Sequence, residues 1–563
     1  MASPSRSIIE TRGEQMFLRL DDREIQRLCR FGSAKSYPAG EYLVRTGQPG
    51  PGLVVILSGE VAISQHDLLD HEKPITTHVR GSFMGELAQL SGQPALVDAL
   101  AKSDVEALVI PSEKLSEALV GEADLGEKIM RALILRRVGL LETAAGGPII
   151  IGHADHADVL RLEGFLSRNG HPHQHLDPDT DAEARTLLER FHVDAYLLPI
   201  VVCPNGKWLY NPSERELATC IGLVKPIDPG KVYDTAIVGA GPAGLAAAVY
   251  AASEGLSVIV LDCRAFGGQA GASARIENYL GFPTGISGLA LTARAYNQAR
   301  KFGAEFGIPD EVVGLNCALN PSAAPFEVVL NSDERVKTRS VLIANGAVYR
   351  RLDLSNLGAF EGTSVHYWAT ALESKLCEGQ EVVLVGAGNS AGQAVVFLAG
   401  QVAKVWMIVR RKDLEATMSQ YLVDRIRALP NVQVLTETEV SSLEGENGVL
   451  KSVRWRHRKT GEETARPVRH LFLFIGAEPN SGWLTKTDVK LDQKGFVLTG
   501  NELEAGRDPL TTSRDGVFAI GDIRSGSVKR VAAAVGEGAQ VVAMLHAYLA
   551  RRNAAKLAQE ARV

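Results

Sequence analysis

The stretch Thr235-Ala236-Ile237-Val238-Gly239-Ala240-Gly241-Pro242-Ala243-Gly244 decides how most of this chain folds. A short apolar run leads into a Gly-x-Gly-x-x-Gly motif, and an alanine-rich segment suited to a helix follows. In a strand–turn–helix unit such glycines let the backbone approach a pyrophosphate, and the free N–H groups of the helix N-terminus bind the anion. The stretch therefore predicts a dinucleotide-binding βαβ unit.

A second fingerprint of the same kind lies further along the chain. The apolar run Val382–Val385 precedes Gly386-Ala387-Gly388-Asn389-Ser390-Ala391. After the first fingerprint, Asp262 follows the run Ser257–Leu261, where a carboxylate accepts hydrogen bonds from ribose hydroxyls. Two dinucleotide sites suit a chain that passes hydride from a nicotinamide to a flavin.

The composition is that of a globular protein with several domains. The chain has 563 residues, of which 45% are hydrophobic and 22% charged, and its net charge is −6. There is no basic footprint for nucleic acid, no apolar run of about 18 residues, and no hydrophobic signal core between Met1 and Glu14. We expect a cytoplasmic protein that binds neither nucleic acid nor membranes. Six scattered cysteines without a CxxC pair predict buried thiols rather than a disulfide framework.

Residues 1–143 read as a small β-roll flanked by the helix-like stretches Asp21–Phe31 and Glu113–Leu141. Apolar and polar residues alternate from Tyr42 to Val79, and Gly85-Glu86 and Pro94 follow. This segment resembles the cyclic-nucleotide-binding domain. The resemblance implies that Glu86 holds a ribose hydroxyl and that an arginine after the proline binds the cyclic phosphate, but Ala95 occupies that position. With only Gly85 and Glu86 left of the site, we favour a degenerate sensor or docking module; cyclic-nucleotide binding is the alternative.

Residues 147–224 read as strand, helix, strand, helix, two strands and a terminal helix. This order resembles a thioredoxin or glutaredoxin module, with Pro199 at the cis-proline position and His153–His156 where a CxxC would lie. Cys203 is either a lone reactive thiol or a buried bystander. The alternating residues His171, His173 and His175 are predicted to share one face of a strand. A metal site with His153, His156 or Asp177 is the alternative to a polar strand edge, and we expect no metal.

The remaining motifs closely resemble bacterial thioredoxin reductase over some 320 residues. They include Gly267-Gly268-Gln269, Ile276–Pro283, Ile343–Ala347 and Gly516–Asp522. The resemblance implies a homodimer with an FAD domain formed by residues 231–355 and 481–551, and an inserted NAD(P) domain over residues 356–480. It also implies FAD binding by Gly239, Gly241, Gly244, Asp262, Gly268, Gln269, Asn278, Gly521 and Asp522.

The second fingerprint predicts the nicotinamide site. The run Val405–Val409 ends in Arg410-Arg411, and no carboxylate stands there to favour NADH. Guanidinium groups bind a 2′-phosphate, so NADPH is expected and NADH is the alternative. The predicted NADP-binding residues are Gly386, Gly388, Asn389, Ser390, Arg410 and Arg411.

The dithiol of the thioredoxin reductase family is missing. The resemblance places a Cys-Ala-Thr-Cys motif where this chain has Trp368-Ala369-Thr370-Ala371. Thiolate attack on a disulfide needs a thiolate, so no dithiol relay operates at this position. Trp368 either packs against the isoalloxazine ring or fills the core.

Together these features predict a multidomain α/β protein. Its parts are a cyclic-nucleotide-binding-like β-roll, a thioredoxin-like module and two Rossmann-like domains. The expected function is an FAD-dependent NAD(P)H oxidoreductase, thioredoxin reductase-like, with an unknown electron acceptor and a regulatory N-terminal domain. The alternatives are a redox-sensing flavoprotein without multiple turnover and a ferredoxin–NADP reductase-like enzyme.

Overall fold

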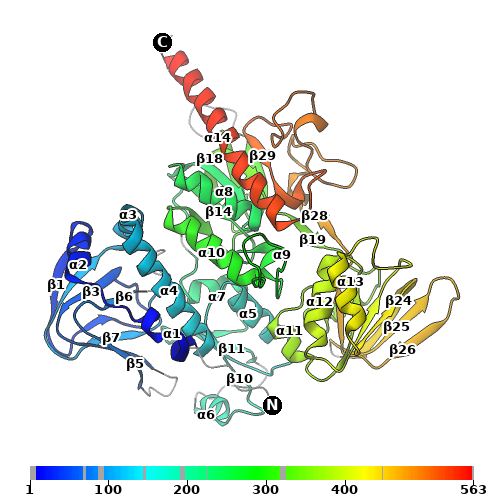
Figure 1. Ribbon diagram of the computed structural model, residues 1–563, viewed down its shortest axis with the longest axis horizontal. Coiled ribbons are helices and arrows are strands. Elements are labelled where there is room, and N and C mark those ends of the chain that lie inside the picture. The colour runs from blue at the N-terminus through cyan, green and yellow to red at the C-terminus, as the bar shows by residue number, and fades with distance from the viewer. Residues whose placement is uncertain are drawn as a thin grey trace. The chain divides into compact units, whose positions relative to one another are not determined.

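The computed structural model describes residues 8–66, 72–85, 94–143, 147–190, 194, 197–224, 226–317, 325–446 and 448–560. The chain divides into two compact units, which we describe separately (Figure 1). The first unit comprises Met1–Ala154, Phe165–Pro226 and Asn297–Pro309. The second comprises Asp155–Gly164, Ile227–Tyr296 and Asp310–Val563.

The N-terminal part of the first unit is the expected β-roll of two antiparallel sheets, with strand orders β1-β8-β3-β6 and β2-β7-β4-β5. The first sheet is buried on both faces: one face packs with the helices in one core, and the other packs against the second sheet in another core. The strands are β1 (Ser33–Tyr37), β2 (Tyr42–Val44), β3 (Leu53–Ser58), β4 (Val61–His66), β5 (Glu72–His78), β6 (Phe83–Met84), β7 (Asp98–Ala101) and β8 (Val105–Ile110). The helices are α1 (Ile8–Met16), α2 (Asp22–Leu28), α3 (Ser112–Gly121) and α4 (Ala123–Thr143).

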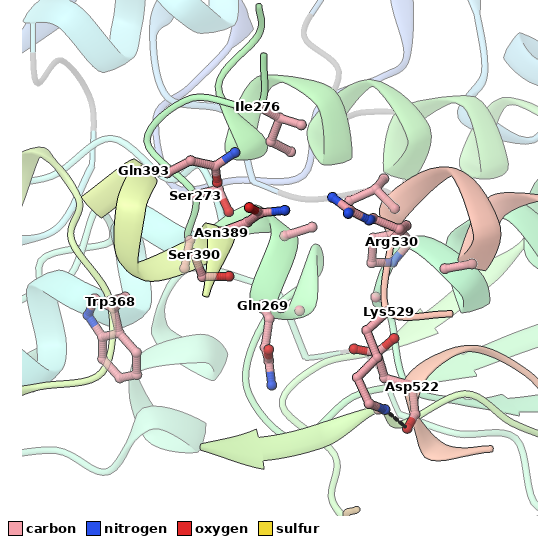
Figure 2. Close-up of a pocket in the computed structure, with 18 of the residues that line it drawn as sticks. Gln269, Ser273, Ile276, Trp368, Asn389, Ser390, Gln393, Asp522, Lys529 and Arg530 are labelled. Atoms are coloured by element: carbon pink, nitrogen blue, oxygen red, sulfur yellow. Dashed lines mark hydrogen bonds between the residues drawn. The ribbon is translucent and has the colours of Figure 1, made fainter. Parts of the chain in front are cut away.

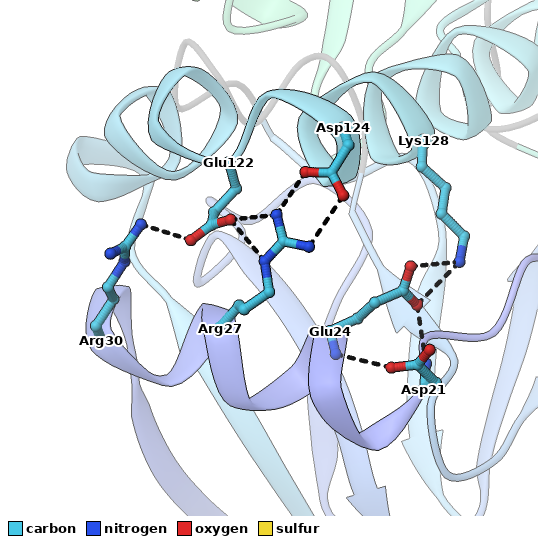
Figure 3. Close-up of polar contacts among 7 residues, drawn as sticks. All are labelled: Asp21, Glu24, Arg27, Arg30, Glu122, Asp124 and Lys128. Carbon is cyan, nitrogen blue, oxygen red and sulfur yellow. Dashed lines mark hydrogen bonds and ion pairs between the residues drawn. The ribbon is translucent and has the colours of Figure 1, made fainter.

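Charged side chains join α2 to the start of α4 (Figure 3). Glu122 accepts hydrogen bonds from Arg27 at 2.7 Å and from Arg30 at 2.5 Å. Arg27 also contacts Asp124, and Lys128 donates to Glu24 at 2.8 Å. Glu24 also closes a capping box with Asp21 at the N-terminus of α2. The same network therefore caps α2 and links it to the start of α4.

The middle segment forms a four-stranded sheet of order β10-β9-β11-β12. Strand β9 pairs in parallel with β10 and antiparallel with β11, so the sheet is mixed. The peptide bond Leu198–Pro199 is cis. The elements are β9 (Ile149–Ile151), α5 (Ala157–Arg168), β10 (Gln174–Leu176), α6 (Ala182–Arg190), β11 (Ile200–Val202), β12 (Trp208–Tyr210) and α7 (Glu214–Cys220).

Two expectations for the cysteines are wrong. Cys203 and Cys220 form a disulfide, whereas the scattered cysteines predicted thiols. Cys29 and Cys263 are exposed rather than buried. Sequence spacing does not reveal that the chain turns through the β11–β12 hairpin and returns along α7, which brings Cys220 beside the end of β11.

The predicted histidine face is also absent, because only His175 of the three histidines lies in a strand. His171 is buried and its Nδ1 lies 3.0 Å from the carbonyl oxygen of Pro172. The proline after His171 removes a backbone N–H that a strand at this position would use. The strand therefore begins only after His173.

The second unit begins with the sheet that the first fingerprint predicts, ordered β14-β13-β18-β17-β16 with β29 beside β18. The parallel strands β13, β14 and β29 are almost wholly buried, which explains their continuous apolar runs. The elements of the second unit are β13 (Val232–Val238), α8 (Pro242–Ser253), β14 (Val258–Leu261), α9 (Gly268–Gly271), β16 (Val312–Cys317), β17 (Phe326–Leu330), β18 (Arg335–Ile343) and β29 (Val517–Ala519). Helix α10 (Gly288–Lys301) begins in the second unit and ends in the first, to which β15 (Glu305–Gly307) belongs.

The chain leaves this sheet through β19 (Ala347–Tyr349) and returns through β28 (Ala477–Pro479), which pair antiparallel. Between them lies a five-stranded parallel sheet of order β20-β27-β21-β22-β23, with a three-stranded antiparallel sheet β24-β25-β26. The elements are β20 (Val365–His366), α11 (Ala371–Leu376), β21 (Glu381–Val385), α12 (Asn389–Ala399), β22 (Lys404–Ile408), α13 (Gln420–Ala428), β23 (Val432–Leu435), β24 (Thr438–Glu446), β25 (Val449–His457), β26 (Glu463–Arg466) and β27 (His470–Leu473).

The last helix, α14 (Val531–Glu560), is longer than the stretch Gly538–Arg551 that its pattern predicts. In the part of the chain that the structure describes, no helix is long and apolar enough to cross a membrane.

Candidate functional site

A cavity of about 540 Å³ lies in the second unit, where the two fingerprint-bearing segments face each other (Figure 2). Eight of the nine residues predicted to bind FAD line it, and Gly244 is the exception. The eight come from the first fingerprint loop, the end of β14, α9, the segment after it, and the turn after β29. They are Gly239, Gly241, Asp262, Gly268, Gln269, Asn278, Gly521 and Asp522.

The glycines of the first fingerprint have different surroundings. Gly239 has φ +108°, and a Cβ there would lie 2.5 Å from the carbonyl oxygen of Ala344. A Cβ on Gly244 would lie 1.9 Å from the carbonyl oxygen of Gly239, so this glycine allows helix and loop to pack closely. A Cβ on Gly241 would meet nothing within 4 Å. Open space at the N-terminus of α8 is what a bound pyrophosphate needs, so this loop fits a dinucleotide.

Asp262 holds the fingerprint loop in place. Its carboxylate accepts backbone N–H bonds from Ala240 at 2.8 Å, from Arg264 at 3.0 Å and from Ala265 at 3.2 Å. Desolvation raises the pKa of Asp262, and these hydrogen bonds oppose the increase. A carboxylate has about four lone-pair positions, so acceptor capacity remains for a ribose hydroxyl on the cavity side.

Other polar groups surround the cavity. Gln269 Nε2 donates to the carbonyl oxygen of Ala347 at 2.5 Å, and Lys529 Nζ donates to that of Asp522 at 2.9 Å (Figure 2). Asn345 donates through Nδ2 to Asn480, while its buried Oδ1 has no partner among the described residues. A buried oxygen without a donor marks a place where a polar ligand group fits.

Trp368 lies on the wall of the same cavity, in the loop between β20 and α11. Its Nε1 donates to Glu373 Oε1 at 2.7 Å, and Glu373 also accepts from the backbone N–H of Thr370 at 2.9 Å. The ring of Tyr349 lies 6.5 Å from the indole ring, centroid to centroid. Trp368 therefore belongs to the cavity wall, and its packing against a flavin stays a prediction.

The predicted nicotinamide residues divide into two groups. Asn389 and Ser390, at the start of α12, line the cavity, whereas Gly386, Gly388, Arg410 and Arg411 lie outside its lining. Gly386 has φ +152°, and a Cβ on Gly388 would meet nothing within 4 Å. The two arginines follow β22 after the buried Val409 and are exposed, and no ion pair to either is present in the described part of the chain.

Sequence reasoning missed several residues of the cavity. Asn345 belongs to the motif Ile343–Ala347, but the sequence assigned this residue no function. Lys529 and Arg530 form a basic pair between the Gly521-Asp522 turn and α14. The basic pair could have been recognised from the sequence, because lysine and arginine side chains near a predicted pyrophosphate can form charge-assisted hydrogen bonds with it.

Among the described residues of the N-terminal domain, the position expected for the phosphate-binding arginine offers no cation. Gly85 has φ +152°, and Glu86 lies outside the described residues. Ala95 is 5% exposed and packs in the core of the β-roll, and Asp98 accepts the backbone N–H of Thr46 at 2.6 Å. A buried methyl group therefore stands where the family offers a guanidinium.

In the middle segment, His153 comes together with Asp177 and Asp179 after the ends of the parallel strands β9 and β10. One ligand-type atom from each lies within 4.8 Å of the others. His153 Nδ1 lies 3.0 Å from Asp179 Oδ2, and the two oxygens of Asp177 accept the backbone N–H groups of Ala154 and Asp179. These polar contacts hold the three side chains together.

Comparisons with known proteins agree with this geometry. Residues 233–538 match the family described as "Pyridine nucleotide-disulphide oxidoreductase", and residues 34–121 match the cyclic nucleotide-binding domain. Over 313 residues the chain is 35% identical to a thioredoxin reductase of Mycolicibacterium smegmatis, covering 54% of this chain and 93% of that protein. Over 312 residues it is 32% identical to a thioredoxin reductase of Bacillus subtilis, covering 55% and 92%. The crystal structure of Lactococcus lactis thioredoxin reductase in its FR conformation aligns with a TM-score of 0.52 at 25% identity, covering 57% of this chain and 99% of that one.

Proposed function

The chain belongs to the pyridine nucleotide-disulphide oxidoreductase family, and we propose that it is an FAD-dependent enzyme that oxidises NADPH. It is a thioredoxin reductase-like oxidoreductase with a cyclic nucleotide-binding domain. The observation that carries the proposal is the cavity, because eight residues chosen from sequence motifs line one space that opens onto the free N-terminus of α8.

The residues that line the cavity have separate roles in this proposal. Gly239 and Gly241 let the backbone approach the pyrophosphate of FAD, and Asp262 holds the loop while it accepts from the ribose. When bound, FAD supplies the ring system that exchanges electrons with a nicotinamide. Trp368, held by Glu373, covers one side of the cavity and limits access of water.

The experiment is direct. The purified protein should be yellow, should release FAD rather than FMN, and should lose its flavin absorbance when NADPH is added without oxygen. Recovery of FMN alone, or failure to take up any flavin on reconstitution, would refute the proposal.

We also propose that the chain forms a homodimer, as the resemblance to thioredoxin reductases implies, and that the N-terminal domain regulates the enzyme or docks on it. Sedimentation equilibrium of the full chain tests the first statement. A concentration-independent monomer mass would contradict it.

A further inference from the structure

The disulfide Cys203–Cys220 has no role in the site described above. It joins the residue after β11 to the last residue of α7. In the described part of the chain it is the only disulfide. Cys203 is 3% exposed and Cys220 is half-buried, so the Cys220 sulfur is the more accessible of the two.

Two of the other cysteines, Cys263 and Cys377, are poor candidates for redox chemistry. Burial raises the pKa of Cys377 to about 12, and the nearby Glu373 adds to the shift. Desolvation, with Asp262 and Glu311, raises the pKa of Cys263 to about 12, although that residue as a whole is exposed. Such thiols carry almost no thiolate at neutral pH, and the thiolate is the reactive form.

Two observations argue against a purely structural role for this disulfide. The exposed cysteines Cys29 and Cys263 are free, which suits a reducing environment. In such an environment disulfides are usually transient and catalytic or redox-sensing. The middle segment also has an apolar core of its own, which includes Ile151, Leu176 and Val202, so its sheet does not depend on a covalent link.

The chain therefore has a proposed flavin site that lacks the family dithiol, and it has a disulfide elsewhere. Trp368 and Ala371 stand where the family dithiol is expected, and neither contains sulfur. We propose that the Cys203–Cys220 disulfide is the electron acceptor of the enzyme; this inference rests on the proposed function. NADPH, a proton and the disulfide give NADP⁺ and two thiols: the S–S bond breaks, two S–H bonds form, and both electrons come from the nicotinamide.

An anaerobic titration of the full-length, FAD-loaded protein with NADPH tests the proposal. Wild type should consume two NADPH per FAD before free NADPH accumulates, because flavin and disulfide each take two electrons. The Cys203→Ser/Cys220→Ser variant should consume only one. The matched control Cys29→Ser changes an exposed free cysteine and should still consume two.

A second readout does not depend on turnover. After NADPH treatment and acid quench, alkylation and peptide mapping should show Cys203 and Cys220 newly modified, whereas both are protected before treatment. This readout needs only wild-type protein, so it decides the matter even where the double variant fails to fold.

The outcomes separate the two proposals. Flavin that bleaches with one NADPH while Cys203 and Cys220 stay protected overturns the disulfide inference and leaves the proposed function standing. If dithiothreitol reduces the disulfide but NADPH does not, the disulfide is a structural link. Bound flavin that neither NADPH nor NADH bleaches refutes the proposed function itself.

Discussion

At the scale of single residues, two glycines of the first fingerprint serve opposite purposes. Gly244 is needed by the protein, since a side chain there would collide with the backbone of Gly239. Gly241 is needed only by a ligand, since a side chain there would enter open space and its φ of −72° suits any residue. The Gly241→Ala variant should fold normally but lose FAD affinity at least about tenfold, which flavin content and thermal unfolding measure together.

Gly536 in α14 is the matched control, because a Cβ there also meets nothing within 4 Å. Gly536→Ala should keep its flavin and gain up to about 1 kcal/mol in stability through helix propensity. Full flavin content in Gly241→Ala would show that the pyrophosphate does not pass this residue.

Arg410 and Arg411 lead to a prediction about nucleotide choice. Both are exposed at the end of β22, so a 2′-phosphate can reach them. Removing a charge-assisted contact costs about 1.5–3 kcal/mol, so the Arg410→Ala/Arg411→Ala variant should lose about tenfold or more in its preference for NADPH over NADH. Stopped-flow flavin reduction with each nucleotide measures the ratio, with Arg131→Ala as the surface control. An unchanged ratio would remove the two arginines from the site.

At the scale of elements, the network around Glu122 links α2 to α4. Glu122 is buried and serves both Arg27 and Arg30, so Glu122→Gln leaves two cations with a weaker acceptor. We expect a loss of about 1–2 kcal/mol in the free energy of unfolding. Arg131→Ala breaks only an exposed pair with Glu127 and should cost less than about 0.5 kcal/mol. Urea unfolding followed by circular dichroism compares them; equal losses would show that the network adds nothing.

The elements also show which features are readable from sequence. The run Thr235–Val238 lies within β13, and α8 begins at Pro242, because glycine and proline set backbone conformation locally. The order of strands and helices in residues 147–224 agrees with the prediction for the same reason. The Cys203–Cys220 pair was missed, since it depends on how β11 and α7 come together.

The candidate site divides in the same way. Residues inside recognisable motifs, such as Gly241 and Asp522, were assigned in advance. Asn345 and Lys529 reach the cavity from segments that become neighbours only when β18 pairs with β29. Pairing between strands so distant in sequence has no local signal.

At the scale of the whole molecule, buried histidines predict a loss of stability in acid. His366 Nε2 lies 3.1 Å from His470 Nδ1, and burial lowers their pKa values from 6.5 to about 4 and about 3. Burial likewise lowers the pKa of His78 and of His171 to about 3. Unfolded histidines bind protons below 6.5 and folded ones do not, so stability is complete above that pH and falls as the pH drops toward 4.

Each such histidine should reduce the free energy of unfolding by up to about 2 kcal/mol between pH 6.5 and pH 5. The His470→Asn variant should show a weaker pH dependence than wild type in urea unfolding over this range. A variant that loses as much stability as wild type would mean that His470 does not stay neutral in the folded protein.

The N-terminal domain should not act as a cyclic-nucleotide receptor. With the buried Ala95 in place of an arginine, the cyclic phosphate lacks its cation, which costs about 1.5–3 kcal/mol. Calorimetry on the full chain should show dissociation constants for cyclic AMP and cyclic GMP of tens of micromolar or weaker. Submicromolar binding would show that another group holds the phosphate.

The pairing of β19 with β28 has a consequence for how such chains diversify. Tyr349 and Ala477 are paired across the two strands, so the chain between them leaves the host sheet and returns to it at the same place. The entropic cost of closing a loop rises only with the logarithm of its length, so a whole domain at this position costs the host sheet only about 3 kcal/mol more than a short turn would. Residues 350–476 thus enter and leave the host sheet at one place, so we expect a domain of different specificity to be accommodated there while the host sheet keeps its fold.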